Sequence, residues 1–209
     1  MPHKTNRKLK LMRLMQIINE KTDEEHPLTA KQLCEELKTY GIIAERKSIY
    51  SDIEVLIECG MDINKSYGTK QGFYLATREF ELPEIRLLID AVSSAPFITM
   101  KKTKHIINKL EKLVSIYQAQ ELESQIFIEE KTKFRNEEIY YSIDTIHRAI
   151  YSNKKIAFNY HSQKIINGSA LFDEGKRLKV SPYALVWIDG KYHLLANEEG
   201  SKGKITDYR

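Results

Sequence analysis

The chain has 209 residues, of which 42% are hydrophobic and 30% are charged, and this balance excludes wholesale disorder and collagen-like repeats. At roughly 150 residues per domain, we expect one or two ordinary domains or three small ones. The 33 basic and 29 acidic residues leave a net charge of +4, which does not identify a partner by itself. The N-terminus is polar and basic, and no run approaches the roughly 18 apolar residues of a membrane span, so we expect a cytoplasmic protein with no membrane partner.

Three helices are predicted before residue 60. Residues 7–20 carry apolar side chains at helical spacing on one face, namely Leu11, Leu14, Met15 and Ile18. A second helix follows the capping-box pair Thr29 and Gln32 and ends at Gly41. A third spans residues 45–59, and its predicted inner face consists of Ile49, Ile53, Leu56 and Ile57. Cys34 and Cys59 fall within these apolar patterns, so we expect reduced core thiols rather than a disulfide or a zinc site.

A β-hairpin is predicted after the third helix. Residues 61–65 alternate apolar and polar side chains, residues 72–75 are aromatic and apolar, and residues 68–70 form the turn between them. Three short helices and a hairpin predict a winged helix-turn-helix domain over residues 1–78, in which the third helix enters the major groove of DNA.

The third helix presents hydrogen-bonding side chains on its outward face, in the turns that can reach base edges and phosphates. The candidate DNA-binding residues on it are Arg46, Lys47, Ser48, Tyr50 and Ser51. The first helix opens with a basic run of Lys4, Arg7, Lys8, Lys10 and Arg13, and the hairpin tip adds Lys65, Lys70 and Tyr67. The alternative for each is a solvated helix face or a frayed basic N-terminus, and the combination of helix order and basic wing favours DNA.

Residues 79–139 are predicted to form a helical linker. One helix begins at Pro83 and carries an apolar stripe of Ile85, Leu88, Ile89 and Val92. A second spans residues 101–117 with a stripe of Ile106, Ile107, Leu110, Leu113 and Val114. Two apolar stripes need a surface that covers them, and a second copy of the chain is the simplest candidate, so we expect a homodimer.

The C-terminal part, residues 140–209, is predicted to be mainly β. A short helix over 143–151 precedes a strand at 155–160. Asp189 and Gly190 lie between the strand patterns of 179–188 and 191–197, which is a strong hairpin signal. The whole chain is therefore expected to be α+β, with a small barrel-like module at its end.

The residues of this part resemble a known family. The stretch from Ser181 to Leu194 is similar to the signature of the WYL domain, whose Trp, Tyr and Leu correspond to Trp187, Tyr192 and Leu194. Residues 46–53, Arg-Lys-Ser-Ile-Tyr-Ser-Asp-Ile, resemble the DeoR-like winged helix that usually accompanies that domain, and the linker from Phe80 to Phe97 is similar too.

The resemblance implies a bacterial transcription regulator in which an Sm-like β-barrel binds a nucleotide-like or nucleic-acid effector and alters the hold of the winged helix on DNA. Two features depart from the family. Ser51 stands where members often have Arg before the Asp that is Asp52 here, so we expect an operator of its own sequence. The family pattern continues past a Tyr-Arg pair, whereas this sequence ends at Tyr208 and Arg209, so an incomplete WYL domain is expected.

Four residues with a hydroxyl group or a fixed charge near the barrel rim are the candidate ligand contacts, because arginine matches phosphate and a tyrosine ring can stack on a base. They are Tyr160, Arg177, Ser181 and Arg209. Arg177 and Arg209 could equally be edge-strand charges that oppose aggregation. Trp187, Tyr192 and Leu194 are expected to be core residues that close the barrel.

No enzyme, metal site or cofactor is expected. The sequence lacks a nucleophile elbow, a Walker loop, a dinucleotide-binding glycine pattern and a His-Glu-x-x-His helix, and its six histidines are scattered. The main hypothesis is a homodimeric regulator that binds a palindromic operator in double-stranded DNA. The alternative is an accessory protein that binds single-stranded nucleic acid or a protein partner through its C-terminal domain.

Overall fold

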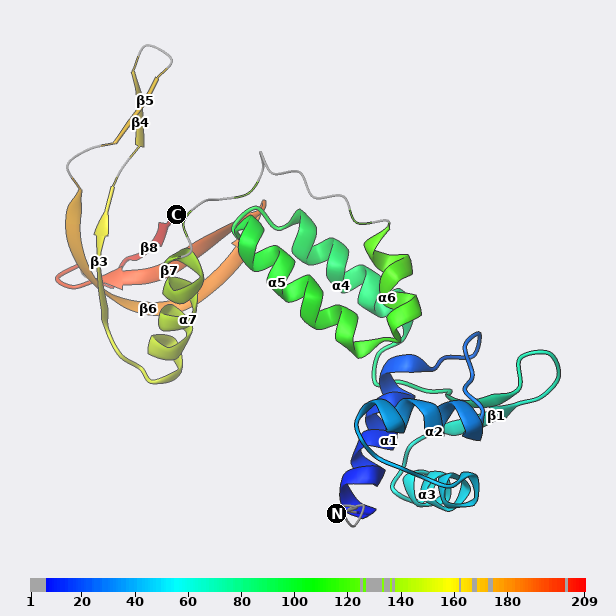
Figure 1. Ribbon diagram of the computed structural model, residues 1–209. Helices are drawn as coiled ribbons and strands as arrows, with labels where there is room; N and C mark the ends of the chain where they lie inside the picture. Colours follow the sequence, from blue (N-terminus) through cyan, green and yellow to red (C-terminus); the bar gives the residue numbers. More distant parts are fainter. Residues whose placement is uncertain are drawn as a thin grey trace. The chain divides into compact units, whose positions relative to one another are not determined.

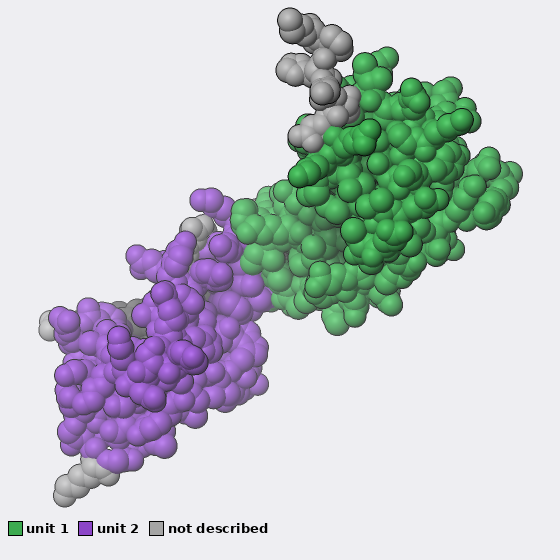
Figure 2. Space-filling view, turned by 90° about the horizontal axis from the view of Figure 1, so that it is seen from below, with its two compact units in different colours: residues 1–94, 103–128 green, residues 95–102, 129–209 purple. Residues whose placement is uncertain are grey.

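The chain is α+β, with helices and one small hairpin first and antiparallel strands later (Figure 1). The computed structural model describes residues 7–124, 126, 133, 136, 138–161, 163–166, 169–172, 175–201 and 203–209. Two compact units divide the chain (Figure 2). The first comprises residues 1–94 and 103–128, and the second comprises residues 95–102 and 129–209.

The first unit begins with the three predicted helices and the predicted hairpin. Helices α1 (Arg7–Lys21), α2 (Ala30–Thr39) and α3 (Arg46–Glu58) precede strands β1 (Ile63–Ser66) and β2 (Gly72–Leu75). The strands are antiparallel, with Ile63 opposite Leu75 and Ser66 opposite Gly72. One apolar core joins these elements, and its fully buried members include Leu14, Ile18, Leu33, Leu37 and Ile49.

Local backbone interactions explain how these elements meet. Thr29 caps α2 and forms the predicted capping box with Gln32. Just before it, Leu28 exchanges two backbone hydrogen bonds with Phe73 of β2, at 2.9 and 2.8 Å. A Cβ atom at Gly72 would lie 2.5 Å from the backbone of Leu28, so glycine is needed for this close approach.

Two expectations for the inner faces of these helices were wrong. Ile57 is 47% exposed, and α3 is buried through Ile49, Ile53 and Leu56 instead. Cys59 follows the last turn of α3 and is exposed, whereas Cys34 is half-buried, so only Cys34 resembles the expected core thiol. The buried face of α3 therefore contains fewer apolar residues than the sequence pattern predicted.

The linker contains more breaks than predicted. Helix α4 (Leu82–Ser94) is followed by α5 (Met100–Leu110), the 3-10 turn η1 (Glu111–Leu113) and α6 (Ile116–Glu123). The single helix expected over residues 101–117 was wrong, because Ser115 has extended backbone and caps α6 in a capping box with Gln118. The helical spacing of apolar residues continues across this break in the sequence, because Val114, the residue before the cap, is also buried.

The apolar stripes of the linker cover one another. Ile85 and Ile89 of α4 pack with Ile107 of α5, Val114 and Leu122 in a core of their own. Leu88 and Leu113, expected on the inner faces, are 38% and 40% exposed. The stripes are therefore buried in part within the unit, without a second copy, and the homodimer stays a prediction.

The second unit contains helix α7 (Glu138–Tyr151) and a four-stranded antiparallel sheet. The helix begins five residues before the predicted 143–151 segment, at a point where Asn136 accepts a hydrogen bond from the Glu138 amide. The strands are β3 (Ile156–Tyr160), β6 (Lys176–Ile188), β7 (Lys191–Glu198) and β8 (Ile205–Tyr208), in the order β3-β6-β7-β8. Strands β4 (Gln163–Ile166) and β5 (Ser169–Phe172) form a separate hairpin.

The predicted small barrel is not closed by the described strands. Strands β3 and β8 are the two edges of the four-stranded sheet and do not pair with each other. The predicted hairpin is confirmed, since Asp189 and Gly190 connect β6 to β7 with positive φ angles of 49° and 75°. Helix α7 contacts β6, and its Ile146 packs on a sheet core that includes Val180, Leu194 and Ala196.

The three signature residues occupy different environments. Leu194 is 6% exposed and belongs to the sheet core, as predicted. Trp187 is 43% exposed, and its ring contacts the rings of Tyr192 and Phe97 at centroid distances of 4.7 and 4.8 Å. The expectation that all three are core residues was wrong, because Trp187 is exposed and Tyr192 is half-buried where they pair beside the Asp189–Gly190 turn of the β6–β7 hairpin.

Candidate nucleic-acid interface

The first two turns of α3 present their polar side chains outward. Arg46, Lys47, Tyr50 and Ser51 are exposed, and Ser48 is half-buried with its hydroxyl donating to the Glu45 carbonyl at 2.8 Å. No acidic residue lies in the first turn, and Glu45 makes no side-chain cap to the helix. Positive side chains and the positive end of the helix dipole therefore occur together at this end.

A buried ion pair neutralises the acidic residue of this segment. The Nζ atom of Lys10 lies 2.6 Å from the Oδ2 atom of Asp52, and the two side chains are 11% and 19% exposed. The contact joins α1 to α3 as a pair of opposite charges that is largely shielded from solvent. Asp52 is thus occupied inside the unit instead of opposing the charge of Arg46 and Lys47.

The basic run of the first helix contributes less free charge than expected. Lys10 is buried against Asp52. Arg13 donates to Gln16 at 2.6 Å and lies over the Tyr40 ring at 4.8 Å. Arg7 and Lys8 are exposed on α1, and Lys4 lies outside the described residues.

An aromatic cluster joins α3 to the hairpin. The rings of Tyr50 and Phe73 meet edge to face at 5.6 Å. Lys65 lies over Phe73 at 5.8 Å and over Tyr67 at 5.2 Å. Tyr50 and Lys65 thus share one cluster, which places a cation of the hairpin beside the outward face of α3. Lys70 is paired instead with Glu25 of the α1–α2 connection, at 3.3 Å and at exposed positions.

A buried polar network that the sequence analysis missed attaches α6 to the α1–α2 connection. Asp23 is 5% exposed and Ser115 is fully buried, and the Ser115 hydroxyl donates to the Asp23 carboxylate. His26 contacts the same carboxylate at 2.8 Å, and its ring stacks on Tyr117 at 3.7 Å. Burial raises the pKa of Asp23, but the hydrogen bonds from Ser115 and His26 outweigh it, so the net pKa lies below the ordinary value.

The same connection is tied to the hairpin. Thr22 is fully buried and accepts a hydrogen bond from the Leu75 amide at 3.0 Å. The Arg78 guanidinium donates to the Thr22 carbonyl at 2.7 Å. Residues 22, 75, 78 and 115 are far apart in the sequence, so no local pattern pointed to this network.

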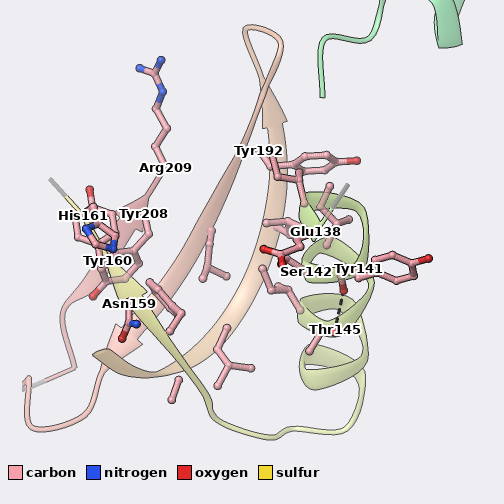
Figure 3. Close-up of a pocket in the computed structure, with 18 residues that line it drawn as sticks. Glu138, Tyr141, Ser142, Thr145, Asn159, Tyr160, His161, Tyr192, Tyr208 and Arg209 are labelled. Carbon is pink, nitrogen blue, oxygen red and sulfur yellow. Dashed lines mark hydrogen bonds between the residues drawn. The ribbon is translucent and has the colours of Figure 1, made fainter. Parts of the chain in front are cut away.

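A cavity of about 760 Å³ lies between α7 and the sheet of the second unit (Figure 3). Tyr160 and Arg209, two of the four predicted ligand contacts, line it. Arg177 and Ser181 lie on β6 and are not among its lining residues. The cavity thus brings together Tyr160, Arg209 and His161, with Tyr208 beside them, and the sequence analysis did not select Tyr208.

Tyr208 is the most buried polar side chain of the cavity wall. It is 7% exposed, and its ring meets the rings of Phe158 and Tyr160 edge to face at 5.6 and 5.5 Å. Its hydroxyl is buried and has no hydrogen-bond partner among the described residues. A buried hydroxyl without a partner is unfavourable, so the arrangement leaves a hydrogen bond to be made.

The described residues contain no group of three or more His, Cys, Asp and Glu side chains that could hold a metal ion. His193 contacts Asp207 at 2.9 Å across β7 and β8. Within the described residues, none of the helices is both long and apolar enough to cross a bilayer.

Comparisons with known proteins give little further information. No protein-family profile and no curated protein matches the chain. Among solved structures, the chain is similar to the proteasome accessory factor B/C (PafBC) of Arthrobacter aurescens, with 17% sequence identity and a TM-score of 0.29. The match covers 96% of this chain and 31% of the other, so the chain spans less than a third of that protein.

Proposed function

We propose that the chain is a DNA-binding regulator whose first unit contains a winged helix-turn-helix module over residues 1–78. In this proposal α3 lies in the major groove, and β1 and β2 form the wing. The observation that carries the proposal is the exposed polar face of α3, where Arg46, Lys47, Tyr50 and Ser51 are accessible together. If this face were packed against the rest of its unit, a duplex could not reach it.

Charge distribution around α3 supports the same role. Lys10 neutralises Asp52, and Lys65 lies in the aromatic cluster that includes Tyr50 and Phe73. Arginine and lysine at a helix end can contact phosphates and guanine edges, while a hairpin lysine contacts the DNA backbone.

The proposed regulator also senses an effector through its second unit, and the nucleotide-like class implied by the WYL resemblance is one candidate. We propose no catalytic activity.

The test is retention of duplex DNA. The full chain is incubated with a library of random 30-base-pair duplexes, and the retained fragments are sequenced and remeasured by gel shift. We expect a recurrent sequence motif and an affinity that falls steeply with salt. A palindromic motif would agree with a homodimer, and light scattering would give the oligomeric state directly.

Matched variants locate the interface. Arg46→Ala with Lys47→Ala removes two positive charges from α3, and we expect affinity to fall at least roughly tenfold, or about 1.4 kcal/mol. Lys109→Ala with Lys112→Ala removes the same charge from exposed positions of α5 and η1 and should change affinity little. Equal losses in both double variants would mean that net charge, and not α3, holds the DNA.

A further inference from the structure

The cavity of the second unit has apolar walls that the described residues do not cover. Side chains from α7 and from the sheet face it, and several are only half-buried despite their apolar character. These half-buried wall residues are Ile143, Ile146, Ile156, Phe158 and Leu185. A volume of about 760 Å³ lies within the range of small-molecule sites, and an apolar ligand would remove this surface from water.

The polar groups of the cavity lie at its two ends. Figure 3 shows Tyr160, His161 and Tyr208 grouped at one end, and Glu138 and Ser142 on α7 at the other. Apolar side chains occupy the space between the two groups. A ligand that fits this arrangement has an apolar middle and a polar head.

The end formed by β3 and β8 favours a hydrogen-bond acceptor or a negative charge. The buried Tyr208 hydroxyl has no partner among the described residues, and a ligand oxygen that reached it would accept a hydrogen bond from it. Arg209 follows directly in the sequence and lines the rim, where Figure 3 shows its side chain extending outward. The opposite end carries the carboxylate of Glu138, which disfavours an anion there.

We propose that this cavity binds a small amphipathic acid, with an aromatic or aliphatic body and a single anionic head held near Tyr208 and Arg209. A nucleotide phosphate carries more charge and is usually met by several convergent cations or backbone amides. Two cations of the sheet, Lys176 and Arg177 on β6, do not line the cavity, and Lys176 is paired with Glu198 at 2.8 Å. This assignment rests on the proposed sensing role of the second unit and does not depend on DNA binding by α3.

The experiment uses 8-anilino-1-naphthalenesulfonate, an aromatic molecule with one anionic group, titrated against the full chain without DNA. We expect one saturable site per chain by equilibrium dialysis, with the fluorescence increase that follows transfer to an apolar environment. Ser142→Trp places a large ring at an exposed position of the cavity wall and should abolish binding. The matched variant His147→Trp lies on the same helix outside the cavity lining and should bind normally.

Two conservative pairs test the head group. Tyr208→Phe removes one hydroxyl and should weaken binding roughly three- to tenfold, whereas Tyr183→Phe, at an exposed position of β6, should not. Arg209→Gln should weaken binding roughly twofold or more at low salt, and Arg177→Gln should have no effect. Circular dichroism of each variant checks that its fold is intact.

Three results would overturn the assignment. Unchanged binding by Ser142→Trp would place the probe elsewhere, and full affinity of Tyr208→Phe would remove the proposed head contact. Displacement of the probe by AMP at similar concentrations would make the cavity a nucleotide site. Retention of duplex DNA is measured separately on the same preparations, so a failure here and a failure of the proposed DNA binding are distinguished.

Discussion

The outward face of α3 and the cavity beside α7 present opposite kinds of surface. On α3 the polar side chains point away from a fully buried apolar face, and Arg46 and Lys47 project from a rigid helix. In the second unit apolar side chains line a concave wall, and its buried hydroxyl, Tyr208, is unpaired among the described residues. The first surface suits an extended, charged partner, and the second suits a small apolar one.

Exposed charge and exposed apolar surface therefore arise in different ways within this chain. Where a helix has its apolar side buried, its outward charge is available to a polyanion. Where a sheet is only partly covered by a helix, the remaining apolar wall is available to a ligand. The following predictions test whether the two surfaces are as independent as this comparison assumes.

The largest expected effect comes from core truncation. Leu33→Ala, at a fully buried position of the α1–α3 core, should lower the free energy of unfolding by about 2–5 kcal/mol, because it removes contacts and leaves a cavity. We expect DNA retention to fall while binding of the naphthalenesulfonate probe persists. Val180→Ala, at a fully buried position of the sheet, should have the converse effect. Simultaneous loss of both activities in either variant would contradict independent units.

The next effect concerns the ion pair beneath α3. Lys10→Met leaves the Asp52 carboxylate buried without its cation, so the free energy of unfolding should fall by about 2 kcal/mol. Asp52→Asn in the same chain should recover most of that loss, since the unpaired charge is gone. Chemical denaturation of the two single variants and the double variant measures the coupling. Additive losses would mean that the pair contributes nothing to positioning α3 on α1.

A smaller effect is expected from pH. The pKa of Asp23 is below its ordinary value of 3.8, so its stabilising effect is complete above that pH and is lost as the pH falls below it. Asp23→Asn should lower Tm at pH 7, and its difference from the parent chain should shrink at pH 3. Glu24→Gln, at the exposed neighbouring position, should show no such difference. A constant difference between pH 7 and pH 3 would exclude this role.

The smallest effect separates the two hairpin lysines. Lys65 contacts aromatic rings beside α3, whereas Lys70 is paired with Glu25. Lys65→Ala should reduce the slope of log affinity against log salt by roughly 1, the value for one phosphate contact, and Lys70→Ala should reduce it less. Gel shifts at several salt concentrations measure the slopes. A larger reduction for Lys70→Ala would place the DNA on the other side of the hairpin.

Much of the first unit was predictable because its signals are local. The capping box of Thr29 and Gln32, the glycine after α2 and the alternation around the hairpin each act within a few residues. The apolar stripe over residues 101–117 wrongly predicted one helix, because a local pattern does not show that the helix is interrupted. Ser115 is a good helix cap, but its use as one depends on contact with Asp23, 92 residues earlier.

The candidate site was only partly predictable. Tyr160 and Arg209 were selected for their chemistry, and they line the same cavity. Tyr208 was overlooked because a tyrosine near a strand end is ordinary in sequence, and its unpaired hydroxyl is visible only once β8 packs near β3 and α7. The burial of Lys10 was likewise invisible, since Asp52 lies on another helix.

Periodicity, capping and turn chemistry operate over a few residues. For that reason the amino-acid sequence was enough to predict the order of helices and strands, the tight turn at Asp189 and Gly190, and the polar outward face of α3. Tertiary structure alone decided which charges are neutralised, that the linker helices cover one another, and that the described strands form an open sheet with a cavity beneath α7. Those outcomes depend on contacts between residues distant in the chain, and the energy of such contacts is fixed by packing and burial.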